Sequence, residues 1–93
     1  MTDTQVSPHL ITALGSERAT VDSGAKVVTF KEKTHVAYQE VAREGYPNCV
    51  RTLDHASRRW SEPYVLNHGV DNHARAVLTV DEDGFLHVVL GGH

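Results

Sequence analysis

The 93-residue sequence predicts an all-β protein. Three observations predict this class. Short segments are rich in β-branched and aromatic residues, and clusters of turn-forming residues separate them. Part of the pattern also recurs about fifty residues further on, which is a spacing typical of repeated β-sheet units.

Size and composition bound the possibilities. The chain is long enough for one small domain. Its formal net charge of −3 gives no general attraction to nucleic acid or to an anionic membrane. It contains no apolar run of the roughly 18 residues that a membrane span requires, and no signal peptide is visible at its start. Cys49 is the single cysteine, so no internal disulfide is expected and the residue is predicted to be a small buried hydrophobe.

Residues 1–23 are predicted to form an N-terminal segment that is weakly structured or supplies a docking strand. Within it, residues 10–14 are apolar and lie between the breakers Ser7-Pro8 and Gly15-Ser16. This stretch fits either a strand that docks elsewhere or a short helix.

The next part, residues 24–66, predicts a four-stranded antiparallel meander. Charged or polar turns are expected at 31–33 and 54–57, and a loop at 40–46. Pro63 interrupts the fourth strand, because proline has no N–H to donate to a ladder. The predicted strands are 26–30, 34–39, 48–53 and 58–66 with its interruption at 61–63.

Residues 67–93 predict a loop at 67–73 and a hairpin built from strands 76–80 and 85–90. The turn Asp81-Glu82-Asp83-Gly84 joins the two strands, with Gly84 supplying a positive φ. Gly91-Gly92-His93 follows as a second loop. Three histidines, His68, His73 and His93, are therefore expected on the two loops that flank the hairpin.

The two hairpins resemble each other, since His35-Val36 recurs as His87-Val88 in the equivalent strand. The spacing is that of β-propeller blades, so we predict one four-stranded propeller blade at 24–66 and the first hairpin of a second blade at 67–93. A propeller needs about four to eight blades. We therefore expect these residues to be the N-terminal piece of a longer protein; the alternative is a complete small β-sandwich or an obligate oligomer. The isolated chain is expected to self-associate through unpaired strand edges.

Two stretches of sequence resemble a known family. The strand Arg58-Arg59-Trp60-Ser61-Glu62-Pro63 resembles the Lys-Trp-Ser-x-Pro strand of BNR-repeat proteins. The spaced combination of Asp71-Asn72-His73, the following hairpin and Gly91-Gly92-His93 resembles the signature of a BNR-4-type group that includes propeller-fold ulvan lyases. The Asp-box of sialidases is absent. Ala74 and Ala76 stand where this group prefers Gly and Pro.

The resemblance implies a polysaccharide lyase that cleaves beside a uronic acid by β-elimination and acts outside the cytoplasm. It implies that His73 is the catalytic base and that His93 helps to bind or neutralise the uronate carboxylate. An imidazole suits proton abstraction because its ordinary pKa lies near working pH. Asn72 and Arg75 are expected to contact the substrate. No cofactor and no metal are implied, and the isolated chain is expected to be inactive because other blades would complete the cleft.

Two other functions fit the same residues. The first is a non-catalytic BNR-type propeller that binds glycan or protein, which the departures at Ala74 and Ala76 favour. The second is a metal site formed by His68, His73 and His93. Trp60 and Tyr64 could form a platform on which a sugar stacks, although such residues more often pack between blades.

Overall fold

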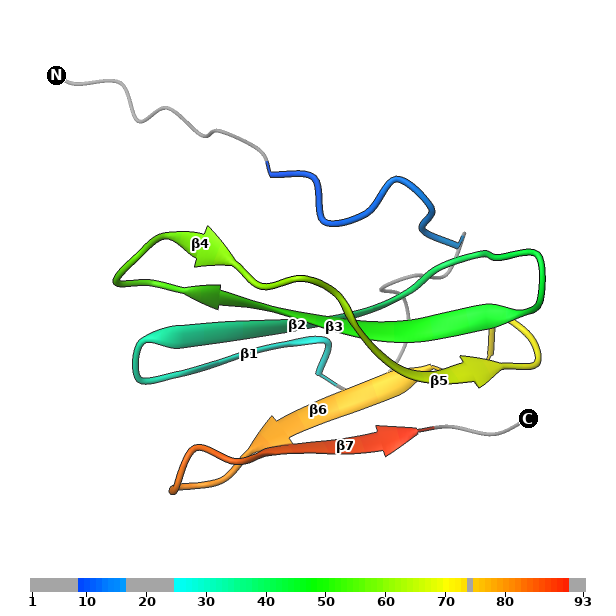
Figure 1. Cartoon of the computed structure of the whole chain (residues 1–93). Helices are drawn as coiled ribbons and strands as arrows, with labels where there is room; N and C mark the ends of the chain where they lie inside the picture. The colour runs from blue at the N-terminus through cyan, green and yellow to red at the C-terminus, as the bar shows by residue number, and fades with distance from the viewer. Residues whose placement is uncertain (1–8, 17–24, 74, 91–93) are drawn as a thin grey trace, which may run out of the picture.

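The computed structural model describes residues 9–16, 25–73 and 75–90. These residues form seven strands in two antiparallel sheets and no helix, which confirms the all-β prediction (Figure 1). Within these ranges no helix is present that is long and apolar enough to cross a membrane.

The larger sheet contains five strands. β1 pairs with β2, β2 pairs with β3, and β3 pairs with both β4 and β5. Every pairing is antiparallel and every connection is local, so the sheet is the meander that the sequence predicted. The strands are β1 (Val27–Phe30), β2 (Lys33–Gln39), β3 (Tyr46–Asp54), β4 (Arg59–Trp60) and β5 (Tyr64–Gly69).

β4 and β5 lie along the same edge of β3 and behave as one strand with a gap. β4 pairs with the end of β3 at Leu53 and Asp54, and β5 pairs with its first half. Ser61 bridges the gap, because its N–H donates to the Thr52 carbonyl (2.7 Å) and its hydroxyl accepts the Thr52 N–H (2.9 Å). The interruption predicted at Pro63 is thus confirmed, and it follows from the missing N–H of proline.

The smaller sheet is a hairpin of β6 (Ala76–Val80) and β7 (Leu86–Leu90). Its turn has Gly84 at φ +90°, as predicted. The Asp81 carboxylate accepts the N–H groups of Asp83 (2.9 Å) and Phe85 (3.0 Å), which closes the turn. The sequence features of this turn therefore act locally, through glycine geometry and an aspartate that caps backbone donors.

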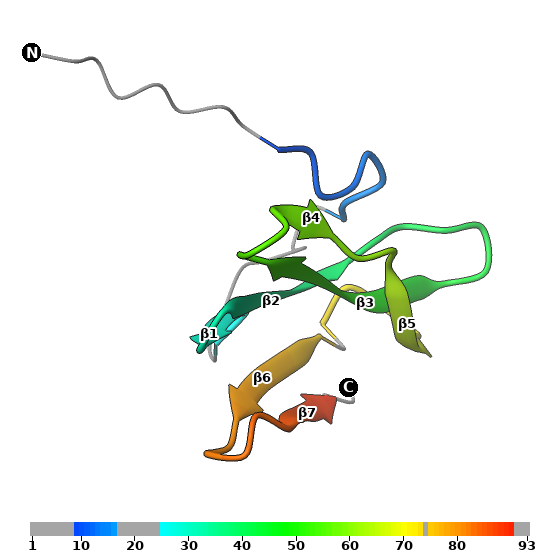
Figure 2. The ribbon, with the colours of Figure 1, turned by 60° about the vertical axis from the view of Figure 1, so that its left-hand side comes forward.

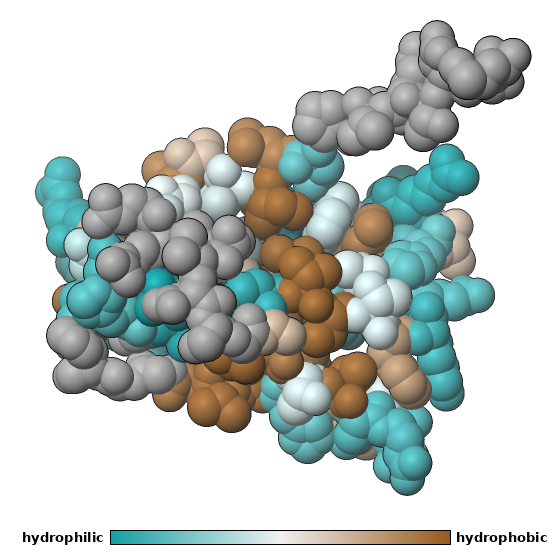
Figure 3. Space-filling view, turned by 180° about the vertical axis from the view of Figure 1, so that it is seen from behind, coloured by the Kyte–Doolittle hydropathy of each residue, from teal (hydrophilic) through white to brown (hydrophobic). Residues whose placement is uncertain are grey.

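The hairpin forms a second layer against one face of the five-stranded sheet (Figure 2). β6 packs on β1 and β2, and the Leu78 N–H donates to the Ala25 carbonyl (2.9 Å). Partly buried side chains surround the contact on both sheets. The buried hydrophobic cluster between the two sheets consists of Ala37, Val50, Ala76 and Leu78. Figure 3, the view of the molecule from behind, shows apolar side chains gathered in a band down the middle of its surface.

Residues 9–16 dock beside the end of β2. The Ser16 N–H donates to the Gln39 carbonyl (3.0 Å) and the Val41 N–H donates to the Leu14 carbonyl (2.8 Å). The Arg51 guanidinium also donates to the Ile11 carbonyl (2.9 Å). Residues 10–14 thus dock on the sheet as expected, but they form neither the strand nor the short helix that the sequence suggested; an isolated bridge joins Gly15 to Glu40.

Two predicted boundaries are wrong by two residues or more. β3 begins at Tyr46, and not at Asn48, and β5 continues to Gly69, so the loop does not begin at residue 67. The two errors are linked, because the extra residues pair with each other as Tyr46↔Gly69 and Pro47↔His68. The sequence suggested turns there because Gly and Pro usually end strands, whereas the long-range pairing overrides that local preference.

The described architecture, an antiparallel meander sheet with a hairpin stacked on it, is consistent with part of a β-propeller.

Candidate functional site

The loop between β5 and β6 carries three of the four predicted site residues. In Figure 1 it lies at the same end of the sheet as the connection between β2 and β3, whereas the hairpin tips lie at the opposite end. A close approach supports this placement, since a Cβ on Gly45 would lie 3.0 Å from the Gly69 carbonyl oxygen. His73 is exposed on this loop, and Asn72 and Arg75 are half-buried.

The backbone of His73 is held from both sides. Its N–H donates to Oδ1 of Asp71 (2.8 Å), and its carbonyl accepts the N–H of Arg75 (3.0 Å). The first contact is the side-chain-to-backbone turn that Asp favours two residues before its partner. The exposed imidazole therefore belongs to a residue whose backbone N–H and carbonyl are both hydrogen-bonded.

A buried amide lies beneath the loop. Gln39, at the end of β2, is fully buried. Its Nε2 donates to the Asp71 carbonyl (3.3 Å) and its Oε1 accepts the hydroxyl of Ser16 (3.0 Å). Gln39 thus connects the docked segment 9–16 to the loop that carries His73. Where the loop ends and β6 begins, the ammonium of the buried Lys26 donates to the Ala76 carbonyl.

His93 and Ala74 lie outside the described residues, so the predicted pairing of His73 with His93 stays a prediction. His68 is not on a loop as predicted: it is an exposed residue of β5. Within residues 9–16, 25–73 and 75–90, no group of three His, Cys, Asp or Glu side chains is placed to hold a metal ion.

Sequence reasoning missed Asp71 as a support for His73 and missed Gln39 entirely. Asp71 carried a usable signal, because Asp two residues before a loop position is typical of this kind of turn. Gln39 carried none, since its partners Ser16 and Asp71 are 23 and 32 positions away in the sequence.

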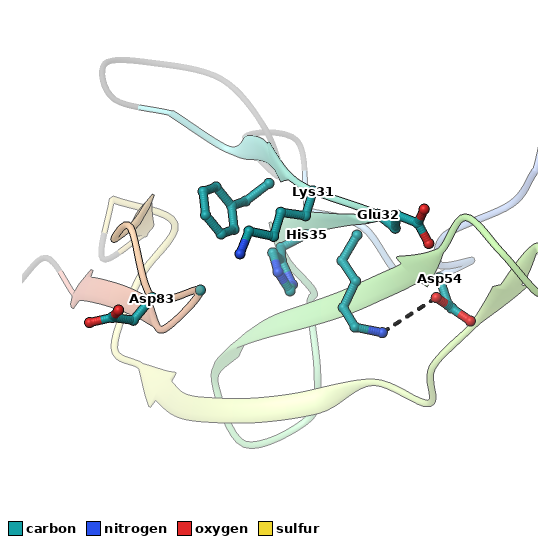
Figure 4. Close-up of a pocket in the computed structure, with 8 residues that line it drawn as sticks. Lys31, Glu32, His35, Asp54 and Asp83 are labelled. Carbon is teal, nitrogen blue, oxygen red and sulfur yellow. Dashed lines mark hydrogen bonds and ion pairs between the residues drawn. The ribbon is translucent and has the colours of Figure 1, made fainter.

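A hollow lies between the tips of the two hairpins, at the end opposite to His73 (Figure 4). Its volume is about 350 Å³, and its charged residues are of both signs. Lys33 is paired with Asp54 (3.4 Å). Burial and the neighbouring Lys33 lower the pKa of His35, whose Nδ1 lies 2.7 Å from the Thr52 hydroxyl. The mixed charges do not select one class of charged ligand.

The two aromatic residues suggested for sugar stacking differ in exposure. Trp60 is partly buried: the ring of His9 stacks on it (5.1 Å between centroids), and the Arg51 guanidinium lies 5.6 Å from its ring centre. Tyr64 is 70% exposed and lines a second hollow of about 310 Å³, which Ser61 and Thr52 also line. Trp60 therefore packs against the docked segment 9–16, whereas the ring of Tyr64 is exposed and accessible to a ligand.

Comparisons with known proteins give a partial match. An ulvan lyase from Alteromonas sp. (strain LOR) is 27% identical over 70 residues, and an ulvan lyase from Nonlabens ulvanivorans is 30% identical over 71 residues. Each match covers 64% of this chain and 14% of the relative, so the chain spans only a small part of the length of these proteins. No protein-family model matches the sequence, and no solved structure matches it. The chain is thus distantly homologous, over part of its length, to ulvan lyases.

Proposed function

We propose that this chain forms part of a β-propeller polysaccharide lyase that cleaves a uronate-containing, ulvan-like glycan by β-elimination. The observation that carries the proposal is the homology to two ulvan lyases, together with an exposed histidine on an ordered loop at one end of the sheet.

The reaction assigns a role to each residue of the loop. His73 removes the C5 proton of the uronate, and the exposure of its side chain leaves it accessible to a polysaccharide. His93 neutralises the uronate carboxylate, which stabilises the carbanion-like transition state. Asn72 and Arg75 contact the sugar from either side of His73. The bond from C4 to O4 then breaks, the leaving oxygen is protonated, and an unsaturated uronate remains.

The test is the product. The complete natural polypeptide that contains this chain is incubated with ulvan, and the ultraviolet absorbance of the unsaturated uronate is followed. His73→Ala is expected to lower kcat by roughly 10²–10⁴-fold, since that is the usual contribution of a general base. His68→Ala is the matched control, because it removes an exposed histidine of β5 that the proposal does not use.

Two results count against the lyase. One is binding of ulvan by the complete polypeptide with no unsaturated product. The other is product formation that His73→Ala leaves unchanged.

A second candidate is a non-catalytic propeller that binds glycan. The exposed ring of Tyr64, beside the hydroxyl-bearing Ser61 and Thr52, favours it. Glycan affinity that survives the double variant His73→Ala, His93→Ala and is lost in Tyr64→Ala is expected if this function is correct.

A further inference from the structure

Gln39 is a neutral amide in a position where most strand residues would be apolar. It is fully buried, in register with the buried Asn48 of β3, and it ends the strand that leads to the loop end of the sheet. Both halves of its amide are used: Nε2 reaches the Asp71 carbonyl and Oε1 reaches the Ser16 hydroxyl. Burying a polar side chain costs free energy unless that side chain forms hydrogen bonds inside the protein.

The contacts of Gln39 converge on the backbone of His73. The carbonyl of Asp71 is held from below by Gln39, while the carboxylate of the same residue accepts the His73 N–H. Asp71 is therefore clamped between a buried amide and the histidine backbone. Two hydrogen bonds, from Gln39 to Asp71 and from His73 to Asp71, thus connect the core of the sheet to the backbone of His73.

Gln39 is in turn held by Ser16. Ser16 donates its hydroxyl to the Gln39 side chain and its N–H to the Gln39 carbonyl (3.0 Å each), and it is 8% exposed. The Asp71 carbonyl can only accept, so it faces Nε2, while Oε1 accepts the Ser16 hydroxyl. The Gln39 side chain therefore connects the docked residues 9–16 to the loop.

We propose that Gln39 is a positioning residue for His73: its buried amide transmits the docking of residues 9–16 to the loop and holds the imidazole in place for proton abstraction. The inference rests on the proposed lyase function. Its structural part, the ordering of the loop by Gln39, is measurable without activity. A proton must be removed from a defined carbon, so the position of the base affects the chemical step more than ground-state binding.

The experiment compares two variants with the parent in the complete natural polypeptide. Gln39→Met keeps the length of the side chain and removes both hydrogen bonds. Thr29→Val is the matched control, because it removes a side-chain hydrogen bond to Thr34 within the same sheet, in the β1–β2 hairpin away from the loop. Hydrogen exchange is measured on peptides that cover residues 70–76 and on peptides from β3, and kcat and KM are measured on ulvan.

In Gln39→Met we expect exchange of residues 70–76 to rise roughly fivefold to tenfold, with exchange in the centre of β3 changed by less than about twofold. We expect kcat to fall about tenfold, with KM within about twofold of the parent. Thr29→Val is expected to leave both the exchange of residues 70–76 and kcat within about twofold of the parent.

Ser16→Ala keeps the inference testable if Gln39→Met does not fold. It leaves the Nε2 contact to Asp71 and removes the brace on Oε1, so a smaller change in the same direction is expected. Unchanged exchange of residues 70–76 in every folded variant would overturn the proposal, and so would an equal fall of kcat in Gln39→Met and Thr29→Val. If the parent makes no unsaturated product, the lyase function fails, while the exchange measurement still decides whether Gln39 orders the loop.

Discussion

At the scale of single residues, Tyr38 and Cys49 show how burial changes the pKa of two weakly acidic groups, a phenol and a thiol. The two residues are paired in the register of β2 and β3. Tyr38 is 3% exposed and Cys49 is 1% exposed. Burial raises the pKa of the Cys49 thiol to about 11 and that of the Tyr38 hydroxyl to about 12, and the nearby Glu40 carboxylate adds to both shifts. The prediction that Cys49 is a small buried hydrophobe is therefore confirmed.

These pKa values predict a loss of stability at alkaline pH. The pKa of the Cys49 thiol is about 11 in the fold, against an ordinary value of 9.0, so the unfolded chain loses this proton first. The unfolded state then binds fewer protons, and the free energy of unfolding falls as pH rises from about 9 towards 11, by about 1–3 kcal/mol from this group. Urea unfolding at a series of pH values measures the slope.

Cys49→Ala serves as the comparison, because it removes the titrating thiol while its cavity lowers stability equally at every pH. The slope between pH 9 and 11 is expected to be shallower in Cys49→Ala than in the parent. Parallel curves for the two proteins would contradict the prediction.

At the scale of elements, the turns of both hairpins contain a residue with positive φ, but the residue type differs. Gly84 has φ +90° in the turn between β6 and β7, whereas Lys31 has φ +56° in the turn between β1 and β2. Only glycine adopts positive φ without steric cost. The first turn therefore contains a lysine in a backbone conformation that glycine would adopt more readily.

This difference predicts unequal effects of two substitutions on stability. Gly84→Ala is expected to lower the free energy of unfolding by about 1–2 kcal/mol, because the new Cβ is strained at positive φ. Space is not the cause, since that Cβ would lie 3.6 Å from the nearest atom, on the Phe30 ring. Lys31→Gly is the matched control and is expected to change stability by no more than about 0.5 kcal/mol. Thermal unfolding of both variants checks the pair; equal losses would refute the conformational explanation.

At the scale of the whole molecule, the smaller sheet has two strands only among the described residues, and β7 pairs with β6 alone there. β7 also exposes apolar side chains, with Val89 at 67% and Leu90 at 39%. An unpaired strand edge with exposed apolar residues is a template for pairing with another chain.

The 93-residue chain alone is therefore expected to associate as its concentration rises. Val89→Lys should shift association to higher concentration, because a charged residue on the edge opposes strand addition. Val70→Lys makes the same change of side chain at a loop residue that is 80% exposed, and it should have little effect. Sedimentation over a range of concentrations distinguishes the two. A parent that stays monomeric, or equal effects of both variants, would contradict the prediction.

His73 became a candidate base through the resemblance of its loop to a family signature. The strand pattern, the gap at Pro63 and the turn at Gly84 were determined by the sequence itself. These features depend on backbone preferences and side-chain alternation within a few residues, which a sequence displays directly. Only the tertiary structure decided that β5 runs to Gly69 beside Tyr46, that Asp71 holds the His73 N–H within an ordered loop, and that Gln39 lies beneath it. The partners of Gln39 are distant in sequence, and a hydrogen bond between distant residues depends on how the sheet and the loop pack and not on any local preference.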